Sequence, residues 1–511
     1  MTKEEELAQL RAENSELREA GLRKDEELAQ VRQAKQELRE GLRQAIEAIE
    51  SLQERVRELE QLQAEKTALR DEVMLLKGQL AKDSHNSSRP PSADRFHRAP
   101  KSLRKKSGKK PGGQPGHQGH HLTLGDTPDH LEVHPVHRCA HCQQDLSAQP
   151  ARLPERRQVI DLPVKRLLIT EHRVEEKQCP TCQQLTRAAF PAQVSAPIQY
   201  GASIQAFAVY LVQYQLVPYA RASELLSDLL GVSLSAGTVQ ALVQQCHTQL
   251  AGVEQQIKSA LEQARVIHQD ETGLSVKGKR SWMHVCSTKT LTHYGVHAKR
   301  GKAAMDAIGI VTHFHGTSVH DGLQSYQGYF FTHALCNVHH LRDLTFIQEV
   351  FKQQWAGEMK ELLLEMKEMV EQAKAQGYTA VDELTRVRLR SRYEDLVAAG
   401  YLANPPDPPL PKKGRTKQHP ARNLLDRLSQ HQEQVLRFLE DFAVPFDNNQ
   451  AERDIRMVKV QQKVSGGFRH AQGATIFCRI RGYLSTMRKQ GQPILAALQH
   501  TLQGQPVLPA F

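Results

Sequence analysis

An apolar stripe with a seven-residue period runs through the first 80 residues. With Leu7 as heptad position a, apolar side chains dominate positions a and d as far as Leu59, where the phase shifts. The segment contains no proline and is rich in Glu, Gln, Arg, Leu and Ala. A single solvated helix with so long a stripe would be unstable in water, so the pattern favours self-association. We expect residues 1–82 to form a coiled coil, and Asn14 at position a favours a defined register in a parallel dimer.

Helical periodicity returns between residues 201 and 250. The stretch from Tyr219 onwards predicts one helix, a turn around Gly231–Ser235 and a second helix opening near Thr238. This is the spacing of a helix-turn-helix motif, whose second helix can enter the major groove of DNA. Ordinary packing of a helical hairpin explains the pattern equally well. We assign residues 196–260 to a helical DNA-binding region, with Thr238 as a candidate DNA contact.

Strand periodicity begins near residue 264. The segments ARVIHQDETGLSV, SWMHVCST and LTHYGVHAKR are strand candidates, followed by a helical GKAAMDAIG and by two further strand candidates, GTSVHD and THALCNVHH. Residues 344–442 have a helical pattern, interrupted by the basic, proline-rich stretch NPPDPPLPKKGRTKQHP. The pattern predicts an α/β domain in two parts, residues 261–343 and 443–511 with the C-terminal segment, separated by an all-helical insertion.

Length and charge add two constraints. A chain of 511 residues is too long for a single hydrophobic core, so several domains are expected. The net charge of +11 indicates an anionic partner such as nucleic acid. No apolar run reaches the roughly 20 residues needed to cross a bilayer, and the N-terminus is polar. We therefore expect an intracellular, cytoplasmic protein without a membrane partner.

Much of the charge lies in residues 83–125, which contain nine Lys and Arg, two Asp, five Pro and six Gly. Such a segment cannot bury a core, so it is either an ordinary solvated linker or a flexible tether that follows a phosphate backbone. We favour the tether. Its candidate DNA contacts are Arg104, Lys105, Lys106, Lys109 and Lys110.

Two CxxC pairs lie in residues 126–195. Cys139 and Cys142 are separated by 36 residues from Cys179 and Cys182. Four thiolates on two tight turns can close a tetrahedral zinc site, and one structural Zn²⁺ would organise a small module without its own core. Between the pairs, RRQVIDLP and KRLLITEHRVEEKQC are strand candidates, which predicts a zinc-ribbon-like module. Redox-active pairs are the alternative, and neighbouring histidines could replace one sulfur: His134, His137 and His141.

Three acidic positions stand out in the α/β domain. Asp270 ends an apolar run, and Asp321 follows the strand candidate GTSVHD. A carboxylate at a strand end needs a partner that offsets its charge, although a single solvated acid is common. Glu452 lies in DNNQAERDIR, where it fits a capping box with Asn449 as N-cap, an ion pair with Arg456, or a helix turn that faces the other two acids.

These motifs, taken together, resemble the insertion sequence 66 family of DDE transposases. The resemblance rests on HQDET, HDGLQSYQGY, HALCNVHHLRDL and DNNQAERDIR, and on NSSRPPS and KKPGGQPGHQG in the basic segment. It implies a prokaryotic enzyme with a ribonuclease H-like catalytic domain, so that the fold class is multidomain α+β. It also implies that Asp270, Asp321 and Glu452 bind two Mg²⁺ or Mn²⁺ ions.

The resemblance further implies the reaction and its partners. The expected enzyme binds the terminal inverted repeats of an insertion sequence, cleaves DNA strands and transfers them to target DNA, in association with the nucleoid. The expected partners are double-stranded DNA, a second or further copies of the chain, and small accessory proteins encoded by the element. Two alternatives are a structure-specific nuclease of the same fold and a non-catalytic, architectural DNA-binding dimer.

Several further residues are candidates for supporting roles. His268 shares a strand face with Asp270 by alternation, and Glu271 points to the opposite face. The CNVHHLR motif offers Cys336, His339 and Arg342, which we assign to active-site support because two ligands do not complete a zinc site. Candidate DNA contacts after Glu452, on a face that could equally be solvated, are Lys459, Lys463, Arg469 and Arg481.

Overall fold

The computed structural model describes residues 2–83, 85–87, 127, 129–150, 157–160, 167–406 and 418–511. The chain divides into two compact units, one formed mainly by the N-terminal helix and the other containing the sheet and most of the remaining helices. The candidate DNA contacts of the basic segment lie outside the described residues: Arg104, Lys105, Lys106, Lys109 and Lys110.

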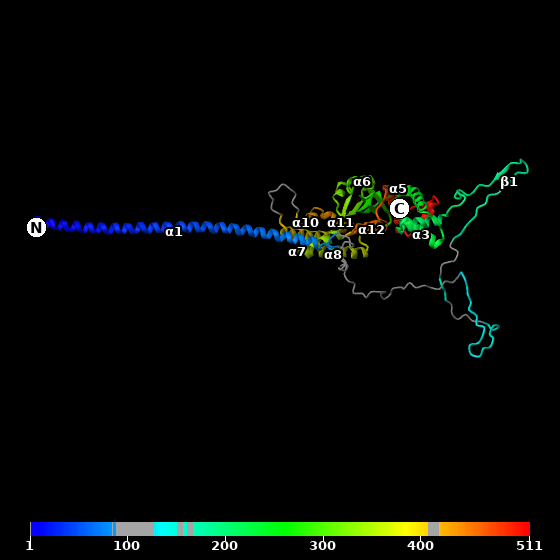
Figure 1. Ribbon diagram of the computed structural model, residues 1–511, viewed down its shortest axis with the longest axis horizontal. Coiled ribbons are helices and arrows are strands. Elements are labelled where there is room, and N and C mark those ends of the chain that lie inside the picture. The colour runs from blue at the N-terminus through cyan, green and yellow to red at the C-terminus, as the bar shows by residue number, and fades with distance from the viewer. Residues whose placement is uncertain are drawn as a thin grey trace. The chain divides into compact units, whose positions relative to one another are not determined.

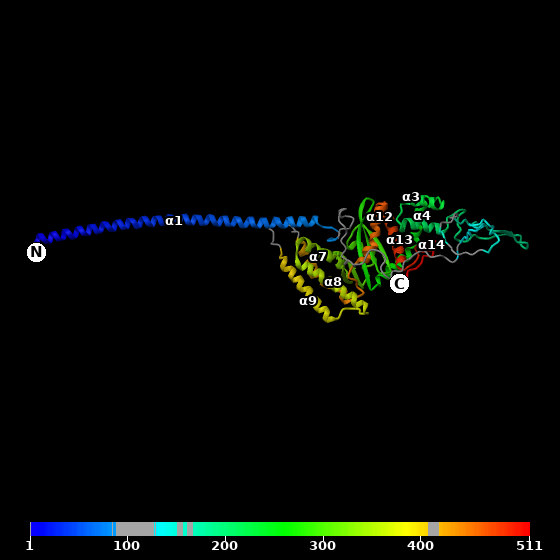
Figure 2. The same cartoon turned by 90° about the horizontal axis from the view of Figure 1, so that it is seen from below.

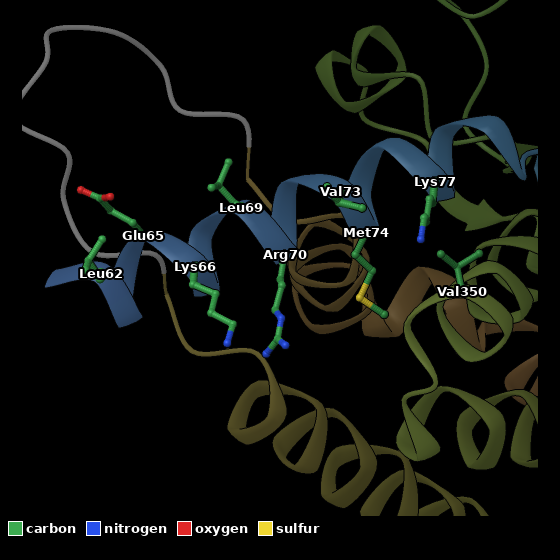
Figure 3. Close-up of a pocket in the computed structure, with 9 residues that line it drawn as sticks. All are labelled: Leu62, Glu65, Lys66, Leu69, Arg70, Val73, Met74, Lys77 and Val350. Atoms are coloured by element: carbon green, nitrogen blue, oxygen red, sulfur yellow. The ribbon is translucent and has the colours of Figure 1, made fainter. Parts of the chain in front are cut away.

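The N-terminal helix α1 spans Lys3–Leu80 without interruption (Figure 1). Its first turn is closed by the Glu5 carboxylate, which accepts a hydrogen bond from the backbone N–H of Thr2 at 2.8 Å. The apolar side chains at the heptad positions are exposed, Leu42 by 62%. Figure 3 shows the last turns of α1, where apolar and basic side chains line a pocket that includes Leu62, Leu69, Val73, Met74, Lys66, Arg70 and Lys77. The helix therefore presents an uncovered apolar stripe along its length.

The core of the second unit is a five-stranded mixed sheet with the order β5-β4-β3-β6-β7. The first three strands pair antiparallel, and β6 and β7 continue the sheet parallel to β3. The bounds of the strands are β3 Val266–Val276, β4 Lys279–Ser287, β5 Thr292–His297, β6 Thr317–His320 and β7 Thr332–Leu335. Each of the five strand candidates of this domain contains a strand, although the last candidate is a strand only in its first half, and the predicted mixed α+β class is confirmed.

Local sequence explains the turn between β3 and β4. Lys277 and Gly278 both have positive φ, 53° and 73°, as a two-residue hairpin turn requires. Side chains of β3 then alternate between the two faces of the sheet. Leu274 and Val276 pack with residues of α12 (Asn449–Ser465) and α13 (Ala471–Lys489), whereas Ile267 belongs to the core on the other face. Figure 2 shows α12 and α13 beside the sheet.

Helices that precede the sheet in the chain and helices that follow it pack into one apolar core. The residues shared by these helices include Leu226, Val243, Leu250, Ile480 and Leu498. The bounds are α2 Ala202–Val209, a π-helical turn η2 Tyr210–Tyr214, α3 Tyr219–Leu230, α4 Ala236–Gln249, α5 Ala251–Glu262 and α14 Ile494–Leu502. No helix in the described part of the chain is long and apolar enough to cross a membrane.

The predicted helix-turn-helix spacing corresponds to α3 and α4. Gly231 ends α3 in the left-handed region, with φ 68°, where glycine is favoured. Helix α4 begins two residues earlier than expected, because the Ser235 hydroxyl accepts a hydrogen bond from the backbone N–H of Thr238 at 3.0 Å and caps the helix. Thr238 is exposed on the first turn of α4.

The described part of the insertion consists of helices and short loops. Its bounds are α7 Asn337–Phe351, α8 Gln354–Ala375, α9 Glu383–Ala403, α10 Pro420–Gln430 and α11 Gln432–Glu440. The expectation that THALCNVHH is one strand was wrong for its second half. Strand β7 ends at Leu335 and α7 begins at Asn337, whose backbone N–H donates to the Phe446 carbonyl at 3.1 Å and whose side chain donates to the Val435 carbonyl at 3.0 Å. The Val435 carbonyl belongs to α11 and the Phe446 carbonyl to the segment after the insertion, so both bonds anchor the start of α7.

The segment that carries the CxxC pairs has little regular structure. Its short strands β1 Glu176–Gln178 and β2 Leu185–Arg187 pair antiparallel and flank the second cysteine pair. Of the longer strands expected between the pairs, only residues 176–178 are extended in a sheet within the described residues. Both faces of β1 and β2 are exposed, so no apolar burial extends them.

Candidate functional site

The pairing of the central strand β3 with β6 places Asp270 next to Asp321, the residue that follows β6. In the parallel pair β3–β6, His268 lies opposite Val319. Continuing this register by two residues brings Asp270 opposite Asp321, and neighbouring strands are about 4.8 Å apart. Strand β6 ends at His320, and the chain turns away after Asp321, where Gly322 has a φ of 89°, whereas β3 continues to Val276 beside β4. The turn is closed by the Asp321 carboxylate, which accepts the backbone N–H of Leu323 at 3.0 Å.

Two hydrogen bonds fix α12 along the same strand. The Asn448 side chain donates to the carbonyl of Gln269 at 2.7 Å, and the Lys459 ammonium donates to the carbonyl of Gly273 at 2.7 Å. Eleven residues of helix cover about 16 Å and four residues of strand about 13 Å. The helix therefore runs parallel to β3, and Glu452, seven residues before Lys459 and on the same side of the helix, is brought toward Asp270.

The electrostatics of Asp270 show that the three acids are near one another. Burial raises the pKa of Asp270 to about 8, and the charges of Glu271, Asp321 and Glu452 contribute to the rise. The backbone N–H of Glu271 donates to its carboxylate at 2.8 Å. Asp321 and Glu452, which follow Asp270 by 51 and 182 positions in the chain, thus both raise the pKa of its half-buried carboxylate. A cluster of this kind strongly favours a cation among its members.

Glu271 points to the opposite face of β3 and has partners of its own. Its side chain is fully buried, and Arg300 donates to it through Nε at 2.9 Å and through Nη2 at 2.6 Å. The Tyr326 hydroxyl donates to its other oxygen at 3.0 Å. Burial, followed by the charge of Asp321, still raises the pKa of Glu271 to about 7. Arg300 also lies 3.8 Å from Asp321, so it links the two strand ends.

Glu452 does not form the capping box that its spacing allowed. Helix α12 begins at Asn449, and its N-cap is Asn448 rather than Asn449. The Asn448 side chain is engaged with β3 and makes no cap, which is why the prediction was wrong. The ion pair with Arg456 is marginal, 4.0 Å long and on a side chain that is 69% exposed. One oxygen of Glu452, Oε1, is buried without a hydrogen-bond partner.

The Cys336 thiol and the His339 ring lie next to Glu452. Ligand atoms of these three residues are within 4.8 Å of one another, the one such group of metal-ligand side chains among the described residues. Arg342, the last residue of the CNVHHLR motif and the third candidate in it, is half-buried and lies about one turn further along α7. The sequence singled out Cys336 and His339 as a pair but did not connect them with Glu452.

The remaining candidates divide into buried and exposed residues. His268 is buried, and its Nδ1 is 3.0 Å from the Asn448 side-chain oxygen, so it packs inside the protein. Arg481 is also buried, donates to the Tyr214 carbonyl at 3.0 Å and stacks over the Tyr214 ring. The proposed DNA contact at Arg481 was therefore wrong. Lys463 and Arg469 are exposed.

The two CxxC turns have the same local geometry. In each, the residue after the second cysteine has positive φ, 60° at Gln143 and 59° at Gln183. Each first cysteine accepts backbone hydrogen bonds that lower its pKa, first from Cys142 and then His141 for Cys139, and first from Cys182 and then Thr181 for Cys179. No three of the four thiols lie within 4.8 Å of one another.

Comparison with protein families identifies the chain. The model of a family described as "Transposase IS66 family" matches residues 197–476, which is more than half of the chain and includes Asp270, Asp321 and Glu452. A second family, described as a family of unknown function (DUF6444), matches residues 2–123. No curated protein matches the chain. From α2 to the first turns of α13, the chain belongs to the IS66 family of transposases.

Proposed function

We propose that the protein cleaves DNA strands at the ends of an insertion sequence and joins them to target DNA, with Asp270, Asp321 and Glu452 as the ligands of two Mg²⁺ or Mn²⁺ ions. The observation that carries the proposal is geometric: Arg300 lies 3.8 Å from Asp321 and 2.6 Å from Glu271, the neighbour of Asp270, and the Asn448 side chain ties the start of the Glu452 helix to Gln269 at 2.7 Å. A ribonuclease H-like fold is supported by three antiparallel strands continued by two parallel ones, with the first acid on the central strand.

The residues at this site fit divalent cations. Hard carboxylate oxygens suit Mg²⁺, which prefers oxygen ligands. Arg300, the basic residue that contacts the cluster, is engaged by the buried Glu271 and lies 3.8 Å from Asp321, so it does not neutralise all four acids. Bound divalent ions would stabilise the attacking and leaving oxygens of a displacement at phosphorus.

The chain itself supplies the rigid mount for this chemistry. Asp270 is held by β3 and Asp321 by the turn after β6, and Glu452 lies in the first turn of a helix that is hydrogen-bonded to β3 through Asn448 at its start and through Lys459 further along. The Glu271–Arg300–Tyr326 group braces the face behind Asp270. With the ligands fixed, water would attack a phosphodiester at the end of the element and release a 3′-OH and a 5′-phosphate. That 3′-OH would then attack a phosphodiester of the target DNA at the same site, and a 3′-OH of the target strand would leave.

Other parts of the chain would hold DNA. The exposed first turn of α4, with Thr238, is available to a major groove, and Lys463 and Arg469 follow Glu452 on the exposed side of the catalytic domain. The basic tether, with Arg104, Lys105, Lys106, Lys109 and Lys110, would follow the backbone. Lys459 contributes charge close to the acids, although its ammonium is already bound to the Gly273 carbonyl.

Cleavage and strand-transfer assays test the proposal. The full-length protein is incubated with Mg²⁺, a labelled DNA carrying the terminal inverted repeats, and a target plasmid. Nicking followed by joining is the expected result. Hydrolysis without joining would indicate a structure-specific nuclease, and binding without cleavage an architectural DNA-binding protein; either outcome would overturn the proposal.

We predict that Cys139, Cys142, Cys179 and Cys182 hold one structural Zn²⁺. The matching turns and the lowered pKa of each first cysteine favour thiolate ligands, and a bound ion would draw the two turns together. Replacing Cys142 and Cys182 by Ser should remove one tightly held zinc ion per chain and weaken DNA binding at least about tenfold. The checks are metal analysis after dialysis and a DNA-binding titration. Retention of that zinc would contradict the prediction, and Cys246→Ser, a buried cysteine of α4, is the control.

We predict that α1 pairs two or more copies of the chain. Its exposed apolar stripe is the feature that another copy would cover. Replacing Leu42 and Ile49, both at position a, by Lys should convert the assembly to monomers in light scattering. The matched control places lysines at Gln44 and Ser51, which also lie seven residues apart but at the outward position c. Monomers from both variants, or from neither, would contradict a heptad interface.

A further inference from the structure

We propose that Cys336, His339 and Glu452 form a second metal site, suited to Zn²⁺. Its Glu452 carboxylate is also a ligand of the proposed Mg²⁺ site, whereas Cys336 and His339 belong to the second site alone. The three residues come from the junction of β7 and α7, from the first turn of α7 and from the first turn of α12. Their ligand atoms are already within 4.8 Å of one another.

The chemistry of the three ligands selects the ion. A thiolate, an imidazole nitrogen and a carboxylate oxygen are the ligands that zinc takes in proteins, and a thiol is a poor ligand for Mg²⁺. Ligand atoms around a tetrahedral zinc are about 3.3–3.7 Å apart. A side-chain shift of about 1 Å is therefore enough to close the site, with the fourth position left for water.

Two polar atoms of these side chains lack a hydrogen-bond partner. His339 Nδ1 and Glu452 Oε1 are both buried, and neither has a hydrogen-bond partner. Leaving a buried polar atom unsatisfied costs about 1–3 kcal/mol, so two such atoms beside one thiol indicate a missing partner. An ion at this position would satisfy both. Its binding deprotonates Cys336, because zinc takes the thiolate, and one proton is released to solvent.

The backbone around the site is fixed before any ion binds. The Asn448 backbone N–H donates to Cys336 Sγ at 3.2 Å, and the Asn337 backbone N–H donates to the Phe446 carbonyl at 3.1 Å. These bonds join the start of α7 to the segment that leads into α12. Burial raises the pKa of the Cys336 thiol to about 12 despite the hydrogen bond from Asn448, so an ion would have to displace the proton as it binds. Ligands from two distant segments are thus preorganised, as a specific metal site requires.

Sharing Glu452 has a regulatory consequence, which rests on the proposed function. A carboxylate that binds zinc beside Cys336 and His339 is withdrawn from the ions held by Asp270 and Asp321. Zinc should then inhibit Mg²⁺-dependent cleavage until a DNA complex or a chelator releases Glu452. The site would keep the transposase inactive when zinc is abundant.

Co²⁺ binding to the full-length protein tests the site without relying on activity. Cobalt bound to thiolate gives a near-ultraviolet charge-transfer band. We compare chains in which Cys139, Cys142, Cys179 and Cys182 are all Ser, so that the remaining thiols are those of Cys246, Cys286, Cys336 and Cys478. The expected result is one thiolate-bound Co²⁺ per chain, reported by this band, in addition to any Co²⁺ that the acids hold. The band should be lost in Cys336→Ser, and the Co²⁺ that gives it should bind at least about tenfold more weakly in Glu452→Gln.

Controls separate a failed site from a failed fold. Cys286→Ser replaces a similarly buried cysteine outside the cluster and should keep the band. His339→Gln, on the partly exposed start of α7, gives a second route to weaker binding if Cys336→Ser does not fold, which circular dichroism reports. An unchanged band in the Cys336→Ser variant, or no band in the parent chain, would overturn the site.

An inhibition assay tests the shared carboxylate. Added zinc should reduce cleavage by the native chain at least about tenfold and leave the Cys336→Ser variant at its zinc-free rate. Equal inhibition of both chains would overturn the regulatory part. If no chain cleaves DNA although cobalt binds as expected, the proposed function fails and the metal site stands.

Discussion

Replacing Asp270 by Asn is expected to lower the rate of Mg²⁺-dependent strand cleavage by more than about 100-fold. Changes to groups that only orient a metal ligand cost about 10–100-fold, and the loss of a ligand's charge should cost more. We expect the largest loss of rate at Asp270, because burial and the charges of three neighbouring acids all act on its carboxylate. The measurement is a single-turnover cleavage assay on end DNA, and Asp321→Asn and Glu452→Gln should behave similarly.

The matched control is Asp395→Asn, which removes an exposed acid of α9 in the helical insertion. It should leave the cleavage rate within about twofold of the native value, since surface substitutions have small effects. Because asparagine has nearly the volume of aspartate, the Asp270 variant should remain folded and still bind DNA. Native-like cleavage by Asp270→Asn would remove the basis of the proposed mechanism.

Replacing Asn448 by Ala is expected to destabilise the folded protein by about 2–4 kcal/mol. The Asn448 side chain donates to the buried Gln269 carbonyl at 2.7 Å and contacts His268 Nδ1 at 3.0 Å. Alanine leaves both groups buried without this partner. Since the same bond sets the start of α12 against β3, Glu452 should also lose its position, and cleavage should fall in the fraction that remains folded.

Asn449→Ala separates this effect from a general weakening of the helix start. Asn449 is the first residue of α12, and the bond that its backbone N–H donates to Asp447 at 3.1 Å survives the substitution. Its cost should stay within about 0.5 kcal/mol. Urea unfolding of both variants gives the comparison, and equal losses of stability would show that the Asn448 side chain does not join helix and strand.

The strands of the sheet, and the alternation of side chains between the two faces of β3, could be predicted from the sequence. Period-2 patterns located all five strands, and alternation separated Asp270 from Glu271 before either side chain was placed. The order β5-β4-β3-β6-β7 was not predictable from periodicity, because β3 and β6 pair residues that are 51 positions apart in the chain. The resemblance to a known family supplied the expectation of one sheet with three acids.

The parts that local patterns missed are those set by distant contacts. A capping box around Glu452 was a sound local reading, but Asn448 is engaged by a strand 179 residues earlier. Arg300 had no local signal, since nothing in AKRGKA indicates that this arginine binds the buried Glu271. Cys336 and His339 were visible as a pair, and only the approach of α12 adds Glu452 to them.

The most direct measurement is anomalous diffraction from a complex of the full-length protein, end DNA and Mn²⁺. The account predicts manganese peaks between β3, the end of β6 and the start of α12. Oxygens of Asp270, Asp321 and Glu452 should lie at coordination distances of about 2.0–2.3 Å from the ions. Peaks located elsewhere, or a Glu452 carboxylate that binds no ion in the DNA-bound state, would contradict it.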